Sequence, residues 1–524
     1  MSVWLQESRA YPNGAVCTPH YLASAAGAAM LAEGGNAIDA AFAANFVLAV
    51  VTPYMCGFGG DLLAMVWNGD PGDLHAYRGV GRAPSGATSK FVRDQTGQNE
   101  MPTFGPHPVT VPGAVEAWFT LIDKFATKSF GELAQRALHY AEEGFPLTKR
   151  GAWFFTQSAF LYDHFDLPDF HEYYGDVAAG DWMRQPQLAR TIRALADHGP
   201  DAYYRGPIGE AIAARLQLAG GCMTSADVAA HAGAWVDPLR AIVRDVEVLE
   251  MPPPTQGVTA LEALRIVDGL DLGAADGPAR QHLLIEAVKL ALADRREYLG
   301  DPDAMTTPPE RLLDDGWIAA RRARVDPERA VDARPRREPD GGTIYMCAAD
   351  RDGMLVSLIQ SNFSGAGSGL RVGEWGINLH NRGSAFVLDD AHPNGLGPEK
   401  MPLHTLIPAM SMRDGRPWLV FGSEGGHGQA QTHTQLIVRM VVDGDDPQRA
   451  ISAPRFTIDP GTGRISMEDH FDPAWIDDLR RRGHDIEVVR GYRHGPGIAH
   501  AIQCLGPGYL CGSDPRAEGG TAGL

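Results

Sequence analysis

The stretch from Pro19 to Val51 constrains the fold most, because apolar and small residues recur through it at helical spacing. Residues 34–36 (GGN) interrupt this pattern and favour a tight turn over one continuous helix. We therefore expect two helices packed against each other. A glycine-rich turn at 56–60 and a strand-like run at 62–67 (LLAMVW) follow them.

The rest of the chain alternates between helical and strand-like patterns, without a detectable internal repeat. Several segments carry an apolar stripe and a charged outer face, as surface helices do. This mixture predicts an α/β or α+β enzyme. We expect helices at Ala114–Phe125, Phe130–Glu143, Gln187–His198 and Gln281–Tyr298, and a strand at Ala241–Leu249.

Size and charge exclude several classes of protein. The chain has 524 residues and 44% hydrophobic content, enough to bury a large core. Its 46 basic and 65 acidic residues give a net charge of −19, which repels nucleic acid and anionic lipid. The N-terminal segment lacks a basic stretch followed by a long apolar run, and no stretch elsewhere is as long as a membrane span. We therefore expect a cytoplasmic protein without nucleic-acid or membrane partners.

Metal and nucleotide motifs are missing from the sequence. The six cysteines are scattered without a Cys-x-x-Cys pair, and there is no His-Glu-x-x-His. The glycine-rich run 365–369 (GAGSG) is not followed by Lys-Ser or Lys-Thr, so a tight turn is the better interpretation. We expect neither a metal nor a cofactor.

The second half of the chain opens with a loose, charged segment, Asp326–Asp340. Residues 343–349 then have the pattern of a strand, 350–353 that of a hairpin turn, and 354–361 that of the returning strand. Thr343 therefore lies at the first position of a strand, directly after a flexible loop. Taken alone, this is an ordinary junction between a loop and a strand.

Residues 341–362, GGTIYMCAADRDGMLVSLIQSN, resemble the segment that opens the small subunit of γ-glutamyltranspeptidases. In that family a Thr is followed seven residues later by the Asp of a hairpin turn, here Thr343 and Asp350. Further blocks resemble the family in the same order along nearly the whole chain. They are GGNAIDAAFAANFVLAVV with GFGGDLLAMV, VPGAVEAW, EMPPPTQG, ALADRREYLGDP, GSGLRVGEWGINLHN, PLHTLIPAMSMRDGRPWLVFGSEGG, APRF and SDPRAEGGTAGL.

The resemblance implies the fold of the N-terminal nucleophile hydrolases, a four-layer αββα sandwich built by two subunits. It also implies self-cleavage between Gly342 and Thr343, into a large subunit of residues 1–342 and a small subunit of residues 343–524. These form an α/β heterodimer from one precursor, and further pairing of heterodimers is left open. Segment 326–340 would be the tail left by cleavage, or else a solvated surface loop.

Cleavage explains how a threonine becomes a nucleophile. The freed α-amino group of Thr343 has an unperturbed pKa of about 8, so near neutral pH it takes the proton of its own hydroxyl. Gly342 suits the position before the cut, because glycine tolerates unusual dihedral angles and close approach. The substrate implied is a small-molecule amide.

The family pattern gives roles to further residues. Ser361 takes the place of a second hydroxyl that bonds to the nucleophile, with a polar strand end as the alternative. Gly425 and Gly426 match the glycine pair whose N–H groups form the oxyanion hole, although such a turn is also purely conformational in many proteins. His404 and Thr405 replace a Ser pair that binds the substrate carboxylate, and both can still donate hydrogen bonds.

Basic residues near these blocks leave alternatives open. Arg78 and Arg82 lie near the family's carboxylate-binding Arg, and we expect one of them to clamp a carboxylate unless both are surface residues. The family pattern does not predict His427 and His433, which either line the site or are structural.

Three positions depart from the family pattern. Phe363, Arg382 and Ala385 stand where γ-glutamyltranspeptidases hold the substrate α-amino group with Asn, Gln and Asp. The lost carboxylate and the added cation both disfavour an ammonium group. We therefore expect weak recognition of glutathione. The expected acyl group carries a carboxylate without an amine, as in the family's oxamate amidohydrolase and glutaryl-accepting acylases.

Three hypotheses about function follow from the sequence. The first is an autoprocessed amidohydrolase whose acyl-enzyme is hydrolysed or passed to an amine. The second is a genuine γ-glutamyltransferase or glutathione hydrolase. The third is an inactive homologue that serves as a scaffold or binding protein. Retention of Thr343, Ser361 and the glycine pair argues against the third.

Overall fold

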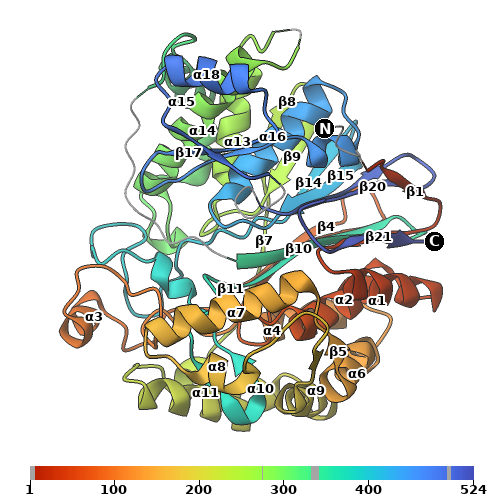
Figure 1. Cartoon of the computed structure of the whole chain (residues 1–524), viewed down its shortest axis with the longest axis vertical. Coiled ribbons are helices and arrows are strands. Elements are labelled where there is room, and N and C mark those ends of the chain that lie inside the picture. The colour runs from red at the N-terminus through yellow and green to blue at the C-terminus, as the bar shows by residue number, and fades with distance from the viewer. Residues whose placement is uncertain (1–5, 274, 332–341, 492–496) are drawn as a thin grey trace.

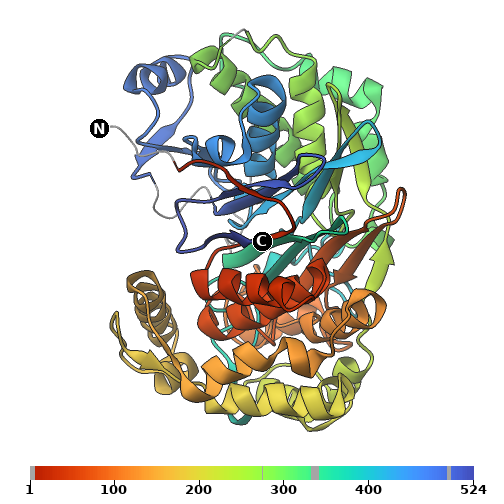
Figure 2. The same ribbon diagram turned by 90° about the vertical axis from the view of Figure 1, so that its right-hand side faces the viewer.

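The computed structural model describes residues 6–273, 275–331, 342–491 and 497–524 (Figure 1). Helices and strands are both abundant, as the sequence predicts. Two large sheets run through the middle of the molecule, and helices lie on either side of them (Figure 2). Among the described residues, no helix is both long and apolar enough to cross a membrane.

One antiparallel sheet of seven strands carries Thr343. In β10, Ile344 and Met346 point to one face and Tyr345 and Cys347 to the other, and all four side chains are buried. Both faces of this sheet are covered, which explains why β11 is buried along its whole length. In spatial order the strands are β21 (Gly520–Gly523), β2 (Ala15–Thr18), β10 (Gly342–Ala349), β11 (Met354–Phe363), β3 (Asp61–Asn68), β4 (Leu74–Gly79) and β7 (Ala234–Val236).

A second antiparallel sheet of seven strands packs on the first. Tyr345 and Cys347 share a buried apolar cluster with Met410, Val420 and Ile502 of this second sheet. The strands, in spatial order, are β1 (Arg9–Tyr11), β20 (Tyr509–Ser513), β19 (Ala499–Cys504), β15 (Arg416–Ser423), β14 (Ala409–Arg413), β9 (Val246–Glu250) and β8 (Leu239–Val243).

The predicted helix pair covers the outer face of the first sheet. It consists of α1 (Tyr21–Ala32) and α2 (Ala37–Val51), with the predicted break between them. Asn36 and Asp39 cap α2 reciprocally. On the same side lie α4 (Ala114–Phe125), α5 (Phe130–Leu133), α6 (Gln135–Glu143), α7 (Lys149–His164), α8 (Asp169–Tyr174), α9 (Pro186–His198), α10 (Asp201–Tyr204), α11 (Pro207–Leu218) and α12 (Ser225–Ala229), with α3 (Ser89–Thr96) at the periphery (Figure 1).

A second group of helices covers the outer face of the second sheet, where they share one apolar cluster with its strands. The predicted helix Gln281–Tyr298 lies here and begins three residues earlier than expected. The group contains α13 (Gly257–Asp268), α14 (Pro278–Tyr298), α15 (Asp315–Arg322), α16 (Gly428–Val442), α17 (Pro447–Ser452) and α18 (Pro473–Arg481), beside a small sheet of β16 (Phe456–Ile458), β17 (Ile465–Glu468) and β18 (Ile486–Val489).

Two predicted elements are wrong in detail. The run 241–249 is not one strand but parts of β8 and β9, joined by a turn at Arg244, whose φ of 56° is left-handed. The predicted helix 130–143 is two helices with a break at Ala134. In both cases a local turn interrupts a pattern that is apolar on both sides.

The hairpin that follows the loose segment is confirmed. Asp350 accepts hydrogen bonds from the N–H groups of Asp352 and Met354, which closes the turn between β10 and β11. Its second oxygen accepts the N–H of Ala37 at 2.8 Å, so the turn is also tied to the start of α2. Most of the predicted loose segment, residues 332–340, lies outside the described residues.

Candidate active site

Thr343 is held at an irregularity between two central strands. Gly342 pairs with Phe363, but Ile344 pairs with Gln360, so β11 has one residue more than β10 at this point. Such a bulge redirects the side chains beside it. Thr343 and Ser361 thereby face each other in a site from which solvent is excluded.

The hydroxyl groups of these residues form a chain that ends on the preceding carbonyl group. Thr343 Oγ1 donates to Ser361 Oγ at 3.2 Å, and Ser361 Oγ donates to the Gly342 carbonyl oxygen at 2.6 Å. Ser361 Oγ also accepts the Phe363 N–H at 2.7 Å. The second hydroxyl therefore contacts both the predicted nucleophile and the bond that it is expected to break.

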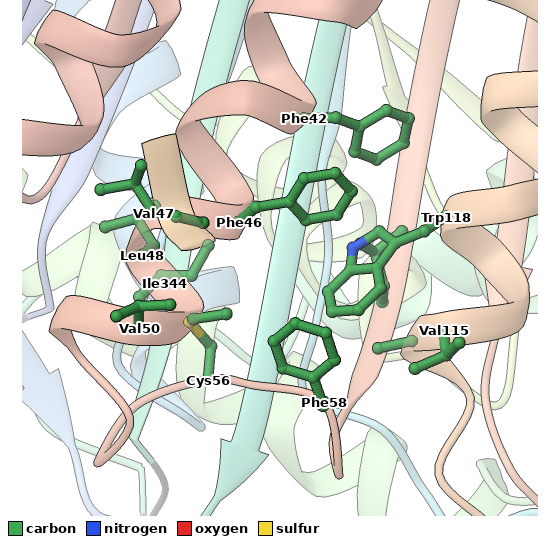
Figure 3. Close-up of a cluster of buried hydrophobic side chains, with 14 of the residues drawn as sticks. Phe42, Phe46, Val47, Leu48, Val50, Cys56, Phe58, Val115, Trp118 and Ile344 are labelled. Atoms are coloured by element: carbon green, nitrogen blue, oxygen red, sulfur yellow. The ribbon is translucent and has the colours of Figure 1, made fainter. Parts of the chain in front are cut away.

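A buried chain of amide groups fixes β11 beside Ser361. Trp118 Nε1 donates to Asn45 Oδ1 at 2.8 Å, and Asn45 Nδ2 donates to Gln360 Oε1 at 2.9 Å. Gln360 in turn donates to the Gly57 carbonyl oxygen at 2.8 Å. The Trp118 ring packs edge-on against Phe46 within the helical layer (Figure 3). Buried amides that satisfy one another in this way hold a strand end in one position.

Phe363, the strand partner of Gly342, lies in contact with Arg382. Phe363 has a φ of 69°, a left-handed conformation that costs a non-glycine residue about 1–3 kcal/mol. β11 ends at Phe363, and the Phe363 N–H donates a hydrogen bond to Ser361 Oγ. Arg382 lies over the Phe363 ring, with its guanidinium carbon 3.9 Å from the ring centroid. Both side chains are fully buried.

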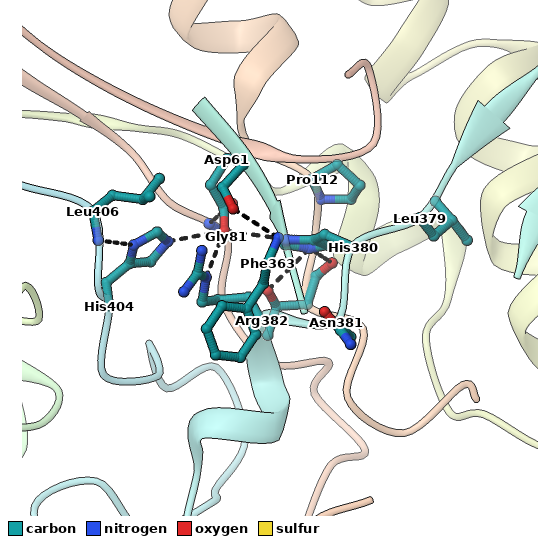
Figure 4. A network of polar contacts seen from close by, with 12 residues as sticks. Asp61, Gly81, Pro112, Phe363, Leu379, His380, Asn381, Arg382, His404 and Leu406 are labelled. Carbon is teal, nitrogen blue, oxygen red and sulfur yellow. Dashed lines mark hydrogen bonds and ion pairs between the residues drawn. The ribbon is translucent and has the colours of Figure 1, made fainter. Parts of the chain in front are cut away.

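Asp61, at the start of β3, is the centre of a polar network (Figure 4). It pairs across the strands with Ser361. One carboxylate oxygen lies 3.0 Å from His404 Nε2, 3.1 Å from His380 Nδ1 and 3.7 Å from Arg382 Nε. Burial raises the pKa of Asp61, but the charge and hydrogen bond of His380 and the hydrogen bond of His404 outweigh burial and hold this pKa well below its usual range.

The two histidines differ in their hydrogen bonds. His404 Nδ1 accepts the Leu406 N–H, so Nε2 carries the hydrogen that is donated to Asp61. Burial, and then the charge of Arg382, lower the pKa of His404 to about 3, which keeps its ring neutral. Both ring nitrogens of His380 instead face oxygen acceptors, the Thr110 carbonyl at 2.8 Å and Asp61.

The structure brings together His404, Thr405, Phe363 and Arg382 from the predicted set. Thr405 Oγ1 accepts a 3.0 Å hydrogen bond from Arg382 Nη1. His404 and Thr405 are therefore occupied by Asp61 and Arg382 respectively. Asp61 and His380 were missed, although a lone Asp that opens an apolar strand is a signal that points to a buried polar site.

Arg78 and Arg82 differ in position. Arg78 Nη1 donates to the Pro253 carbonyl oxygen at 2.8 Å, and the next carbonyl, of Pro254, accepts the His404 N–H. Arg82 donates to a backbone carbonyl, lies 3.8 Å from a carboxylate and has a side chain that is 47% exposed. Arg78 therefore adjoins the network, whereas Arg82 belongs to the surface.

Gly425 and Gly426 form the turn between β15 and α16, with φ angles of 114° and 52°. Within the described part of the chain, neither N–H group donates a hydrogen bond. Gln256 holds this turn, because its Nε2 donates to the carbonyl oxygens of Gly426 and Thr405, each at 2.9 Å. Two N–H groups without partners in a fixed turn are suited to binding an oxyanion. Sequence reasoning missed Gln256.

The predicted histidines of the α16 region do not share one environment. His433 Nδ1 lies 2.7 Å from Glu250 Oε1, and both side chains are buried, so this pair ties α16 to β9. This contact favours the structural interpretation of His433. His427 precedes the first turn of α16, and its carbonyl oxygen accepts a hydrogen bond from Gln431.

A further polar cluster lies at α14, whose side chains meet His484 and the backbone of Asp326 there. Ligand-type atoms of His282, Glu286 and His484 lie within 4.8 Å of one another. His282 Nδ1 is 2.7 Å from His484 Nε2, and Lys289 Nζ contacts both Glu286 and His484. His282 Nε2 also donates to the Asp326 carbonyl oxygen. Because an ammonium group competes with a metal ion, these contacts favour a hydrogen-bonded network.

Comparisons with known proteins agree on one family. The model of the family described as gamma-glutamyltranspeptidase matches residues 23–524. The chain is 35% identical to the glutathione hydrolase-like YwrD proenzyme of Bacillus subtilis, over 97% of this chain and 98% of that protein. It is also 35% identical to the oxamate amidohydrolase proenzyme of Klebsiella pneumoniae, over 99% and 100% of the two chains.

A solved structure is similar along the entire length. The cephalosporin acylase from Bacillus halodurans superimposes with a TM-score of 0.93 at 34% identity, covering 99% of this chain and 97% of that one. These relatives are thus named for hydrolase or acylase activities on different substrates.

Proposed function

The chain belongs to the gamma-glutamyltranspeptidase family, and we propose that it cleaves itself before Thr343 and then hydrolyses small amides with that residue as nucleophile. The observation that carries the proposal is the hydroxyl chain from Thr343 through Ser361 to the Gly342 carbonyl oxygen. Both relatives compared over their full length are named as proenzymes, which supports a cleaved precursor.

The hydroxyl chain suits the cleavage step. Thr343 Oγ1 attacks the Gly342 carbonyl carbon, its proton moves to Ser361 Oγ, and the proton of Ser361 passes to the carbonyl oxygen. The C–N bond then breaks, the nitrogen takes up a proton, and the chain is left joined by an ester. Water hydrolyses this ester, which frees the carboxylate of Gly342 and both the amine and the hydroxyl of Thr343.

The mature site would then act on substrates. The free amine takes the proton of Thr343 Oγ1 as the hydroxyl attacks an amide carbonyl, and returns a proton to the leaving amine. The N–H groups of Gly425 and Gly426 would stabilise the tetrahedral oxyanion, and one such donor contributes about 3 kcal/mol in comparable enzymes. Water, or an acceptor amine, releases the acyl group.

Cleavage would leave one structural unit. β10 and β11 from the small subunit lie between β2 and β3 of the large subunit, in a continuous sheet. The second sheet also combines strands of both subunits, because β1, β8 and β9 come from the large subunit and the other four strands from the small one. Subunits of residues 1–342 and 343–524 would therefore stay associated through strand pairing. We assign the arrangement to the αββα sandwich of the N-terminal nucleophile hydrolases.

The substrate we propose is a small amide whose acyl group carries a carboxylate, such as an oxamate-like or glutaryl-like compound. Arg382 is buried where the family holds an ammonium group, and Ala385 offers no carboxylate there. The nearby Asp61 is engaged by His404 and Arg382. Relatives named as an oxamate amidohydrolase and as a cephalosporin acylase support an acyl group other than γ-glutamyl.

Two measurements test this function. Hydrolysis of γ-glutamyl, glutaryl and oxalyl p-nitroanilides should favour an acyl group without an amine, whereas efficient and selective turnover of the γ-glutamyl compound would support a genuine γ-glutamyltransferase. Thr343→Ala should abolish turnover of every anilide. Turnover that survives this change would exclude Thr343 as the nucleophile.

A further inference from the structure

Arg382 is a buried cation whose hydrogen bonds are incomplete. Its side chain is 0% exposed, and Nη1 donates to Thr405. Neither Nε nor Nη2 has a hydrogen-bond partner among the described residues, although both atoms are shielded from solvent. Arg516, also buried, instead donates to the carboxylates of Glu468 and Asp514 and to two backbone carbonyls. An incompletely bonded buried guanidinium is costly unless a ligand completes it.

Within the part of the chain that the structure describes, Arg382 also lacks a carboxylate within hydrogen-bond distance. Asp61 is the carboxylate in the ion pairs of both His380 and Arg382. In the described ranges, Arg382 has no other ion pair. The 3.7 Å from Arg382 Nε to Asp61 is too long for a hydrogen bond, and this oxygen already accepts from His404 at 3.0 Å. Asp61 is thus shared by two histidines and Arg382, and no carboxylate of the described residues completes the hydrogen bonds of the guanidinium group.

Resting on the proposed role of Thr343, we propose that Arg382 binds a carboxylate of the acyl group through its unpartnered N–H groups. The guanidinium stacks on Phe363, the residue that pairs with Gly342. The bound anion would therefore lie close to Thr343, where the substrate carbonyl is attacked. Guanidinium groups suit this task because their planar donors match the two oxygens of a carboxylate. Asp61 and Thr405 are positioning residues that orient the guanidinium.

This arrangement selects against an α-amino group. An ammonium group beside Arg382 meets a like charge in a site from which water is excluded. Asp61 offers it little compensation, because its oxygens accept from His404 and from the Gly81 N–H. The same acyl chain without the amine meets only the favourable charge. The site therefore has the opposite polarity to one that binds a γ-glutamyl group.

The test compares charged and neutral acyl groups. The substrates are glutaryl p-nitroanilide and its isostere, in which a primary amide replaces the carboxylate, with the succinyl and oxalyl pairs alongside. Arg382→Gln should lower kcat/KM for the charged substrate about 100-fold, mainly through KM, because two charge-assisted hydrogen bonds are lost. The neutral isostere should change by less than about threefold.

Arg413→Gln is the matched control. Arg413 also stacks on a ring, that of Trp418 at 4.2 Å, and its Nε lies 2.9 Å from Asp245. The Arg413→Gln variant should leave the preference for the charged substrate unchanged. Equal losses on both substrates in Arg382→Gln, or a preference that survives this change, would overturn the proposal.

Binding of dicarboxylates gives a second measurement, which does not depend on turnover. Oxalate, succinate or glutarate should bind the wild-type enzyme in calorimetry, and the matching diamide should not. Arg382→Lys should bind the same anion more weakly. Absence of dicarboxylate binding would refute the carboxylate subsite, whereas a chain that stays uncleaved would refute the proposed function instead.

Discussion

The Ser361 hydroxyl group donates a 2.6 Å hydrogen bond to the carbonyl oxygen of Gly342. A donor at this oxygen polarises the peptide bond before Thr343 and stabilises negative charge as the bond is attacked. The same hydroxyl accepts from Thr343. One residue thus connects the proposed nucleophile to the bond that we expect it to break.

Replacement of Ser361 should slow the cleavage. In Ser361→Ala, the Gly342 carbonyl loses its donor and Thr343 its acceptor, so cleavage should slow about 100-fold, the usual effect of losing an oxyanion donor. A time course of fragment appearance on a denaturing gel measures this rate.

The control is Ser357→Ala on the same strand. Ser357 is equally buried, but its hydroxyl bonds to the Tyr345 hydroxyl instead of to Thr343 or Gly342. The Ser357→Ala variant should cleave itself at the wild-type rate. If Ser361→Ala also cleaves at that rate, the hydroxyl chain plays no part in the step.

Gly425 should matter for turnover more than for stability. Its φ of 114° strains any residue with a Cβ, so Gly425→Ala would turn its N–H away from the developing oxyanion. We expect kcat to fall about 100-fold in the cleaved enzyme. Gly444→Ala, at a left-handed position with open space beyond α16, is the control and should keep full kcat. Equal kcat values in both variants would argue against the proposed oxyanion hole.

Glu424, directly before the glycine pair, should set an upper pH limit on activity. Burial raises its pKa to about 8, so it is protonated at neutral pH and becomes charged above pH 8. A carboxylate beside the oxyanion site repels the transition state. In pH profiles of kcat between pH 6 and 10, Glu424→Gln should keep activity where the wild-type enzyme loses it. Superimposable profiles would rule out this role.

Stability should fall on mild acidification. Burial lowers the pKa of His500 to about 4, whereas an unfolded histidine titrates at about 6.5. Between these values the unfolded chain binds the proton more tightly, so the stability present above pH 6.5 is lost as the pH falls toward 4. Melting temperatures should therefore decline from pH 7 to pH 5, with a shallower slope in His500→Gln. Identical slopes would contradict this assignment.

The sequence predicted the local framework of the site well. Periodicity located the helix pair α1 and α2, and turn chemistry located the hairpin closed by Asp350, because both depend on neighbouring residues. It did not predict the bulge that brings Ser361 opposite Thr343, since strand register depends on the whole sheet.

The polar network around Asp61 could not be predicted from the sequence. Asp61 lies hundreds of residues before His380 and His404 in the chain, and no local pattern indicates that they meet. The expectation for Arg382 concerned repulsion of an ammonium group, and the structure adds its incomplete hydrogen bonds and its contact with Thr405. The cytoplasmic location and the pairing of heterodimers stay predictions.

The central claim is that a hydroxyl group becomes reactive once the chain is cut beside it. Intact-mass spectrometry of the purified protein tests this claim most directly. Two species of about 37 and about 20 kDa should appear, the smaller beginning at Thr343, and Thr343→Ala should give one uncut species without activity. A single active chain of 524 residues, whose turnover survives Thr343→Ala, would contradict the account.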